Sequence, residues 1–450
     1  MLGALKRMYL YTTCIVSSDS EFSEEFQTYT GIRQGATSSV YLFIAFMDDL
    51  VQFLEDECIH EPLINIMHCL LHADDTAIIS TSCELLIIKC NKMLVYFREN
   101  CLTLNLKKSS YMIINGKEED IKCDIYLEDE KVLEYNSSYV YLGVVITDNG
   151  NLRYDLETFI DNKRSNVTIK YNNLIRKHVN MPLKYKLQVL DSCVCSVFIY
   201  ACETWGINNV QSLETTYRFG LKRALSVRES TCNELVYIES GRSSLCARIS
   251  KQQLSFWKKL GAYLEENPNH PLKSLIEQGE RSNISYLEHY RNLERTYVSP
   301  EVCQKSIASS FTEELKIKIR QTATTDAESK LGVYFSVNPE LSVPSNELKI
   351  MEVERIVVTR YRCGSHYLKI ETGRWMHPII PRDERFCECH TGVQTLHHCL
   401  FECPLLNDLR NEHNINNFNS VDTAMTSADI FKFLIRMERI LDISVSYPYA

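Results

Sequence analysis

The spacing of apolar side chains predicts two helices in the first hundred residues. Residues 38–57 carry an apolar stripe at helical spacing, and Ser38 or Ser39 precedes it as a candidate cap. Residues 85–101 repeat this period. The stripe of the first predicted helix consists of Leu42, Phe46, Leu50 and Phe53.

Short β-type runs lie between and after these helices. Two of them, 69–73 and 76–80, are separated by only two residues. A third run lies at 110–115, and residues 124–135 predict a hairpin that leads into 139–147. Beyond this point the pattern becomes helical, with a more irregular module near the C-terminus and a last predicted helix before the tail. The fold class predicted is α+β.

Length and composition favour a protein of several domains. A chain of 450 residues is long enough for roughly two to four domains. No uninterrupted apolar run reaches the ~18 residues that a spanning helix needs, so no membrane partner is expected. The 18 cysteines are scattered through apolar segments, which favours free thiols in a reducing compartment, the cytoplasm or the nucleus.

The charge is distributed unevenly along the chain. The net charge of −9 argues against nucleic-acid binding over the whole surface. Residues 161–190, however, carry seven Lys or Arg against one acidic residue, and residues 216–260 carry nine against three. Such stretches can follow a phosphate backbone, although a solvated helix face is the simpler interpretation.

Two adjacent carboxylates, Asp74 and Asp75, separate the first two strand-like runs. Like charges repel, but metal-dependent phosphoryl transfer uses several carboxylates that converge on Mg²⁺ ions about 4 Å apart. A solvent-exposed turn is the alternative, because Asp favours turns. The pair alone does not decide between the two.

Four motifs occur in a fixed order around this pair. In chain order, they are Gly31, Gln34 and Gly35; Ala73, Asp74 and Asp75; Asn105 and Lys108; and Tyr141, Leu142 and Gly143. In this order and at these spacings they resemble the reverse transcriptase of non-LTR (LINE-type) retrotransposons. Segments 198–206 and 223–241 also resemble the region that follows the polymerase core in such elements, so the resemblance covers most of residues 1–260.

The resemblance implies an RNA-directed DNA polymerase, a nucleotidyltransferase that extends a DNA primer on an RNA template with deoxynucleotides. Asp74 and Asp75 would hold catalytic Mg²⁺. Lys108 would neutralise phosphate charge or protonate the pyrophosphate leaving group, and a surface lysine is the simpler alternative. The substrate-binding residues implied are Gln34, Gly35, Asn105, Tyr141, Leu142 and Gly143, of which the last three would grip the primer end or merely form a buried strand.

The chain also departs from the family pattern. The family has a further catalytic Asp on an earlier strand, and we expect that strand to be missing before Gly31, in an N-terminally truncated relative. His72 and Val40 stand where the family has an aromatic residue and Pro. The second acidic pair, Asp48 and Asp49, is interpreted as solvent-exposed and unrelated to catalysis. We therefore expect a chain that is inactive alone, or a non-catalytic nucleic-acid-binding remnant of a retroelement.

A cluster of seven Cys and His residues lies within residues 385–404. The spacing C-x-C-x₈-H-x₄-C predicts a closed, structural Zn²⁺ site. The resemblance favours Cys387, Cys389, His398 and Cys403, while His390, His397 and Cys399 are rival ligands. Such a module would help to hold RNA or target DNA, and the basic residues nearby that support this are Arg360, Arg362, Arg374, Arg382 and Arg385.

These patterns and the resemblance predict a partial right-hand polymerase palm followed by a mostly helical thumb and connector and a small zinc-knuckle-like module. The oligomeric state is left open. The predicted domains are the palm at 1–155, the thumb at 156–265, the connector at 266–350, the knuckle at 351–412, and a C-terminal helix and tail at 413–450.

Overall fold

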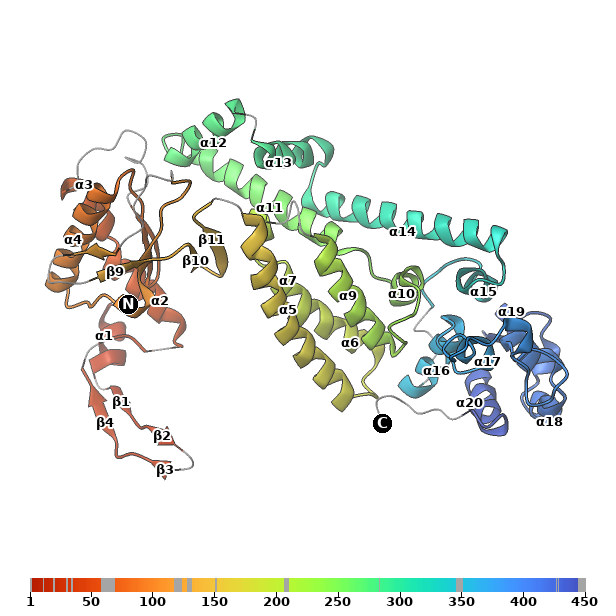
Figure 1. The fold of residues 1–450 in the computed structure, drawn as a ribbon. Helices are drawn as coiled ribbons and strands as arrows, with labels where there is room; N and C mark the ends of the chain where they lie inside the picture. The colour runs from red at the N-terminus through yellow and green to blue at the C-terminus, as the bar shows by residue number, and fades with distance from the viewer. Residues whose placement is uncertain are drawn as a thin grey trace. The chain divides into compact units, whose positions relative to one another are not determined.

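The chain contains both helices and strands as far as residue 147, and it is mostly helical beyond that residue (Figure 1). In this computed structural model the chain divides into two units, Met1–Leu152 and Arg153–Ala450. The predicted boundaries inside the second unit stay predictions. The described residues are 2–10, 12–18, 21–29, 31–33, 35–57, 69–116, 124–127, 132–149, 152–205, 210–282, 284–344, 351–425, 427 and 429–443.

The N-terminal unit has four helices and short strands among its described residues. Its helices are α1 (Leu2–Leu10), α2 (Thr37–Met47), α3 (Leu50–Glu57) and α4 (Cys83–Glu99). Its strands are β1 (Thr12–Cys14), β2 (Ser17–Ser18), β3 (Glu21–Phe22), β4 (Phe26–Thr28), β5 (Cys69–His72), β6 (Asp75–Ile78), β7 (Ser110–Tyr111), β8 (Ile125–Tyr126), β9 (Val132–Tyr135), β10 (Ser138–Tyr141) and β11 (Val144–Thr147).

The single helix predicted over 38–57 is wrong, because a turn at Asp48 and Asp49 divides it into α2 and α3. The apolar stripe continues across this turn, which is why the period alone could not reveal it. The helix predicted over 85–101 is α4, and it begins two residues earlier because Ser82 caps it by accepting a hydrogen bond from the Leu85 amide.

The strands pair in small sheets. β5 and β6 form one antiparallel hairpin, β10 and β11 another, and β9 lies between β7 and β8. β1 and β4 form a two-stranded ribbon that continues into β2 and β3 (Figure 1). The run predicted over 110–115 is a strand for two residues only.

The core of this unit is small. α3 and α4 pack together through Leu50, Leu54 and Met93, which join Met47, Cys69 and Tyr96 in one buried cluster. The stretch Thr37–Leu54, which spans α2 and the start of α3, is long and apolar enough by composition to cross a membrane. One such stretch is weak evidence for a membrane span, because it rests on length and composition only; 22% of it is buried, and Met47, Leu50 and Leu54 contribute to this cluster.

The C-terminal unit is helical in nearly all its regular structure. Its described α-helices of four or more residues are α5 (Leu152–Lys177), α6 (Leu183–Val189), α8 (Cys202–Trp205), α9 (Val210–Leu225), α10 (Asn233–Ser240), α11 (Leu245–Glu266), α12 (Pro271–Arg281), α13 (Ser285–Thr296), α14 (Pro300–Thr325), α15 (Lys330–Val337), α16 (Glu352–Arg362), α17 (Lys369–Thr372), α18 (Asn407–Glu412), α19 (Val421–Met425) and α20 (Ile430–Ile440). A π-helical segment, Leu190–Cys195, continues α6 into the short helix α7 (Ser196–Phe198).

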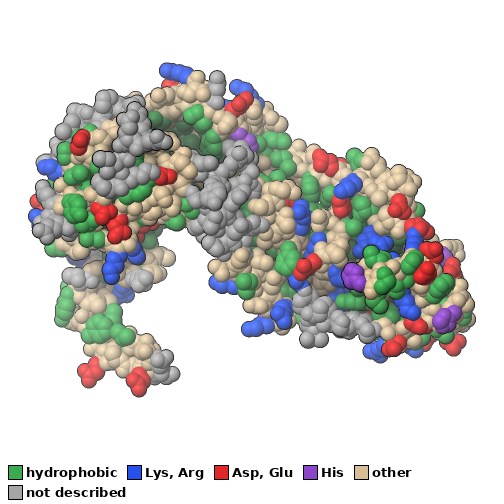
Figure 2. Space-filling view, viewed as in Figure 1, with side chains coloured by type: hydrophobic (Ala, Val, Ile, Leu, Met, Phe, Trp, Pro, Cys, Tyr) green, Lys and Arg blue, Asp and Glu red, His purple; other side chains and the backbone are tan. Residues whose placement is uncertain are grey.

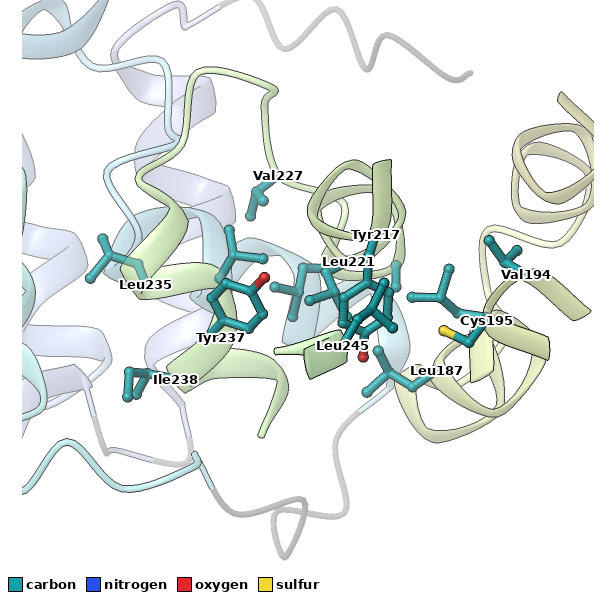
Figure 3. Close-up of a cluster of buried hydrophobic side chains, with 14 of the residues drawn as sticks. Leu187, Val194, Cys195, Tyr217, Leu221, Val227, Leu235, Tyr237, Ile238 and Leu245 are labelled. Atoms are coloured by element: carbon teal, nitrogen blue, oxygen red, sulfur yellow. The ribbon is translucent and has the colours of Figure 1, made fainter. Parts of the chain in front are cut away.

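A continuous apolar core holds the first part of this unit together. Figure 3 shows Tyr217 and Leu221 of α9 lying between Leu187 and Cys195 on one side and Tyr237 of α10 on the other. All five side chains are buried. Full burial of each large apolar side chain contributes about 1.5–3 kcal/mol, so this packing dominates the stability of the unit.

Buried ion pairs join residues 351–443, here called the C-terminal module, to the helices before it. Lys186 of α6 contacts Glu352 of α16 at 2.8 Å, and neither side chain is more than 5% exposed. Arg362 of α16 contacts Glu239 of α10 at 2.8 Å. Because a displaced partner would leave a buried charge uncompensated, these pairs fix α16 against α6 and α10.

Candidate functional site

The Asp74–Asp75 pair lies at a tight two-residue turn between β5 and β6. His72 is directly opposite Asp75 in the antiparallel register, which places Ala73 and Asp74 at the tip. Ala73 has φ +53°, a left-handed conformation that costs a non-glycine residue about 1–2 kcal/mol. Both aspartates are exposed, so their carboxylates can reach a ligand from solvent.

The Tyr141–Gly143 motif forms a second tight hairpin. Tyr141 pairs with Val144, and the turn residues Leu142 and Gly143 have φ +48° and +76°. Positive φ at both turn positions matches the right-handed twist of the flanking strands. Burial and then the charge of Asp75 raise the pKa of Tyr141, so the two hairpins are neighbours within the N-terminal unit.

The third motif lies in a 3₁₀ turn, Leu106–Lys108, that follows Asn105. The carbonyl of Asn105 accepts hydrogen bonds from the Lys108 amide at 3.1 Å and the Ser109 hydroxyl at 2.9 Å. The hydroxyl of Tyr139 in β10 donates to the Lys108 carbonyl at 3.4 Å. The backbone of Lys108 therefore joins this turn to the second hairpin. The side chain of Lys108 is exposed.

The glycine motif before α2 has an open flank. Gly35 has φ +80°, and a Cβ built on it would meet no atom within 4 Å. Glycine is thus required here by backbone conformation and not by a close neighbour in the chain. Gln34 lies outside the described residues.

The described residues supply no third metal ligand beside Asp74 and Asp75. Within the described ranges, the one group of three or more Cys, His, Asp or Glu whose ligand atoms lie within 4.8 Å of one another is elsewhere in the chain. Asp48 and Asp49 are exposed at the α2–α3 turn, where Tyr96 donates a hydrogen bond to Asp49. This second pair therefore belongs to the packing of α4 against that turn.

The group that does converge is Cys387, Cys389, His398 and Cys403. The sulfur atoms of Cys387 and Cys403 are 3.7 Å apart, and the Cys389 sulfur is 3.2 Å from His398 Nε2. A tetrahedral Zn²⁺ with bonds near 2.1–2.3 Å places its ligand atoms about 3.5–3.8 Å apart, so these donors fit the ion.

Local structure explains how the sequence brings these ligands together. Phe386 and Val393 form an antiparallel bridge, so Cys387 and Cys389 lie in the loop between them. The Thr395 hydroxyl accepts a hydrogen bond from the His398 amide at 3.0 Å and caps the helical turn that carries this ligand. The next turn returns the chain to Cys403, whose amide donates to the His398 carbonyl at 2.8 Å.

Glu402 supports His398 from the side opposite the cluster. Its carboxylate lies 3.2 Å from His398 Nδ1, while His398 Nε2 faces Cys389. This arrangement leaves Nε2 as the metal-facing atom and fixes the ring, as carboxylates do behind metal-bound histidines. A Cβ on Gly392 would approach His398 Nδ1 to 3.0 Å, so this glycine makes room for the ring.

The rival ligands take other positions. His390 is exposed, and His397 contacts the second oxygen of Glu402 at 3.2 Å. Cys399 is fully buried, and its hydrogen bond to Cys387 raises the pKa of the Cys399 thiol and lowers that of Cys387. Cys399 therefore lies beside a ligand sulfur.

Three of the five arginines predicted to favour nucleic-acid binding near this cluster are occupied by internal contacts. Arg360 donates to the Ser226 carbonyl, Arg362 pairs with Glu239, and Arg385 donates to the carbonyls of Ile370 and Ile380. Arg382 is 39% exposed and pairs with the exposed Glu328, and Arg374 is 40% exposed with a distant ion pair. The support that these five residues give to nucleic-acid binding therefore narrows to Arg374 and Arg382, and the binding itself stays a prediction.

Comparison with known families identifies the first unit. Residues 3–146 match the family model of reverse transcriptase (RNA-dependent DNA polymerase). This range contains both hairpins, the 3₁₀ turn and the glycine motif, so the N-terminal unit is a reverse transcriptase domain. A comparison with curated proteins found no match.

Sequence reasoning missed three groups that matter to these sites. Glu402 lies four residues after His398 on one helical turn, and that spacing was a usable signal. Arg228, in the loop between α9 and α10, and Lys330, at the start of α15, contact Glu371 from positions far away in the chain, so no local sequence pattern predicts these contacts.

Proposed function

We propose that the N-terminal unit derives from the palm of a non-LTR retrotransposon reverse transcriptase and takes an RNA template, a DNA primer and deoxynucleotides. The observation that carries this proposal is the family match at 3–146 together with the adjacency of the acidic hairpin and the Tyr141–Gly143 hairpin. In this arrangement Tyr141 to Gly143 would support a primer end beside Asp74 and Asp75. Gln34, Gly35 and Asn105 would complete the substrate contacts.

The family's use of Mg²⁺ requires more donors than the described residues provide. Two-metal phosphoryl transfer needs several converging carboxylates, and the described donors beside the turn are Asp74 and Asp75 alone. The described residues therefore do not make up a complete two-metal site. A third carboxylate would have to come from outside the described residues. Without that carboxylate there is no phosphoryl transfer in which Lys108 could assist.

The function best supported for this chain alone is nucleic-acid binding without polymerisation. Loss of one carboxylate from a two-metal site removes transition-state charge stabilisation, the main catalytic contribution in phosphoryl transfer. Binding needs only basic and aromatic surface, and the C-terminal unit exposes Arg374 and Trp375. The abundant thiols support a reducing location, the cytoplasm or the nucleus.

A primer-extension assay tests this proposal directly. We expect the purified chain with Mg²⁺, a primed RNA template and deoxynucleotides to show no incorporation above the Asp74→Ala variant. Asp48→Ala serves as the matched control from the other acidic pair. Incorporation that Asp74→Ala abolishes and Asp48→Ala preserves would overturn the proposal and establish a working polymerase.

For the C-terminal unit we propose a helical thumb and connector followed by a structural zinc knuckle held by Cys387, Cys389, His398 and Cys403. The bound ion would supply cross-linking of the loop and the helical turn, not chemistry. Metal analysis of protein prepared without chelators is expected to find one zinc per chain. Cys403→Ser should lose it and His390→Ala should keep it, and zinc-free wild-type protein would remove the assignment.

A further inference from the structure

A single buried carboxylate in the C-terminal unit faces three cations. Glu371 of α17 is 5% exposed, and Lys330 Nζ of α15 lies 2.8 Å from it. Arg228 approaches it at 3.7 Å and Arg374 at 3.8 Å. Three positive charges against one negative charge leave an excess at this point, and an excess of positive charge attracts anions.

The surrounding groups do not cancel this excess at the site. Glu328 is paired with Arg382, and Glu388 is paired with Lys369 at 2.7 Å. Burial, followed by the charges of Arg228, Lys330 and Arg374, lowers the pKa of His366 to about 3. The cations therefore act on their neighbourhood as a group.

Exposed aromatic rings lie next to these cations. The Arg228 guanidinium lies 4.0 Å from the centroid of the Trp375 ring and also approaches Tyr367. Trp375 nevertheless remains 39% exposed, and Phe386 is 47% exposed. Figure 2 shows hydrophobic and Lys or Arg side chains side by side over the C-terminal elements.

The two exposed rings stand on one rigid base. A Cβ on Gly373 would come within 2.5 Å of the Arg385 side chain, so the segments that carry Trp375 and Phe386 touch at this point. Arg385 is buried and donates to the carbonyls of Ile370 and Ile380, and the Ile380 amide donates to Gly373 at 3.1 Å. The loop between Gly373 and Ile380 is thus closed at its base.

We propose that Trp375 and Phe386 stack on bases of single-stranded nucleic acid while Arg374, with Lys330 and Arg228 behind it, neutralises a phosphate between them. This inference rests on the nucleic-acid binding proposed above and assigns its strand type and residues. Stacking requires unpaired bases, because a duplex hides the base faces that a protein ring can cover. Arg228 beneath Trp375 strengthens the platform by cation–π attraction.

The test uses the full chain and a fluorescein-labelled single-stranded oligouridine in an anisotropy titration. Loss of a stacked base corresponds to a roughly 5–150-fold weaker Kd, so Trp375→Ala and Phe386→Ala should each weaken binding at least about fivefold. Trp375→Phe should retain most of the affinity. Arg374→Ala should also reduce the slope of log Kd against log salt concentration by the amount that corresponds to about one phosphate contact.

The matched controls are Tyr263→Ala, an exposed ring on α11, and Arg436→Ala, an exposed arginine of α20; neither should change Kd. Zinc content and circular dichroism verify that each variant is folded. Binding by the wild type that Trp375→Ala and Phe386→Ala leave unchanged overturns this inference alone. Absence of any wild-type binding overturns the proposed nucleic-acid function itself. If Trp375→Ala and Phe386→Ala weaken the binding of a duplex probe as much as that of the single-stranded probe, the preference for single strands is overturned.

Discussion

The two units of this chain are stabilised in different ways. The N-terminal unit has small sheets, small clusters of buried side chains, and turns in which Ala73 and Leu142 hold left-handed conformations. The C-terminal unit has a long continuous core and buried ion pairs that connect residues more than a hundred positions apart. The residues of the polymerase motifs thus lie on the less strongly packed unit.

This difference indicates where each unit tolerates substitutions without a large loss of stability. Exposed, strained turns can be altered at little cost to stability, and strain of this kind gathers at functional sites. Buried charge pairs cannot lose one partner without a large cost. The chain's three tryptophans, Trp205, Trp257 and Trp375, all belong to the C-terminal unit, so their fluorescence reports on that unit alone.

The largest effect is expected for Glu352→Ala. This change leaves the fully buried Lys186 ammonium without its partner and removes an acceptor for the Leu183 amide, which should cost about 3–5 kcal/mol of unfolding free energy. Urea denaturation followed by tryptophan fluorescence measures it. Glu412→Ala, at an exposed pair with Arg436, is the control and should change stability by less than about 0.5 kcal/mol. Equal effects of the two variants would refute the role assigned to the buried pair.

The next effect concerns the metal centre. Glu402→Ala should weaken metal affinity about 10–100-fold, because His398 would lose the carboxylate that orients its ring. Co²⁺ absorption spectra and Zn²⁺ competition measure the geometry and the affinity. Glu402 is 56% exposed, so the change opens no core cavity. His397→Ala, which removes the other contact of Glu402, should leave the spectrum unchanged; a spectrum unaltered by Glu402→Ala would contradict the prediction.

A pH dependence follows from His366. Its folded-state pKa of about 3 lies below the unfolded value near 6.5, so only the unfolded chain takes up a proton between these values, and stability falls as the pH is lowered through this window. From pH 7 to pH 5 the wild type should lose about 2 kcal/mol that His366→Gln does not lose. Both proteins contain the same metal ligands, so the acid sensitivity of these ligands cancels in the difference between their unfolding free energies. If the unfolding free energies of the two proteins changed with pH in parallel, the pH dependence would not come from His366.

The smallest effect is expected in the acidic hairpin. Ala73→Gly should stabilise β5 and β6 by about 0.5–1 kcal/mol, because glycine adopts φ +53° without steric cost. Hydrogen exchange at the strand amides measures it, since no tryptophan reports on this unit. Ala77→Gly within β6 is the matched control and should have the opposite sign. Faster exchange in Ala73→Gly would show that the turn is not strained.

Local patterns predicted local structure well. The strand-like runs 69–73 and 76–80 correctly indicated β5 and β6, which form a hairpin, and the helical period correctly indicated α4. The single helix over 38–57 failed because a hydrophobic period does not register a turn that preserves the stripe. Four ordered motifs identified the reverse transcriptase domain, because chain order and spacing are properties of the sequence itself.

The sequence by itself determined the order of motifs, the acidic turn and the spacing of the candidate zinc ligands, because each depends on residues close together in the chain. Only the tertiary structure decided that Arg360, Arg362 and Arg385 are occupied internally, and that Lys330 and Arg228 gather at Glu371. The physical reason is that the packing of helices determines which partner a charged side chain meets. This packing brings together residues that are far apart in the chain, and a local sequence pattern carries no information about such pairs.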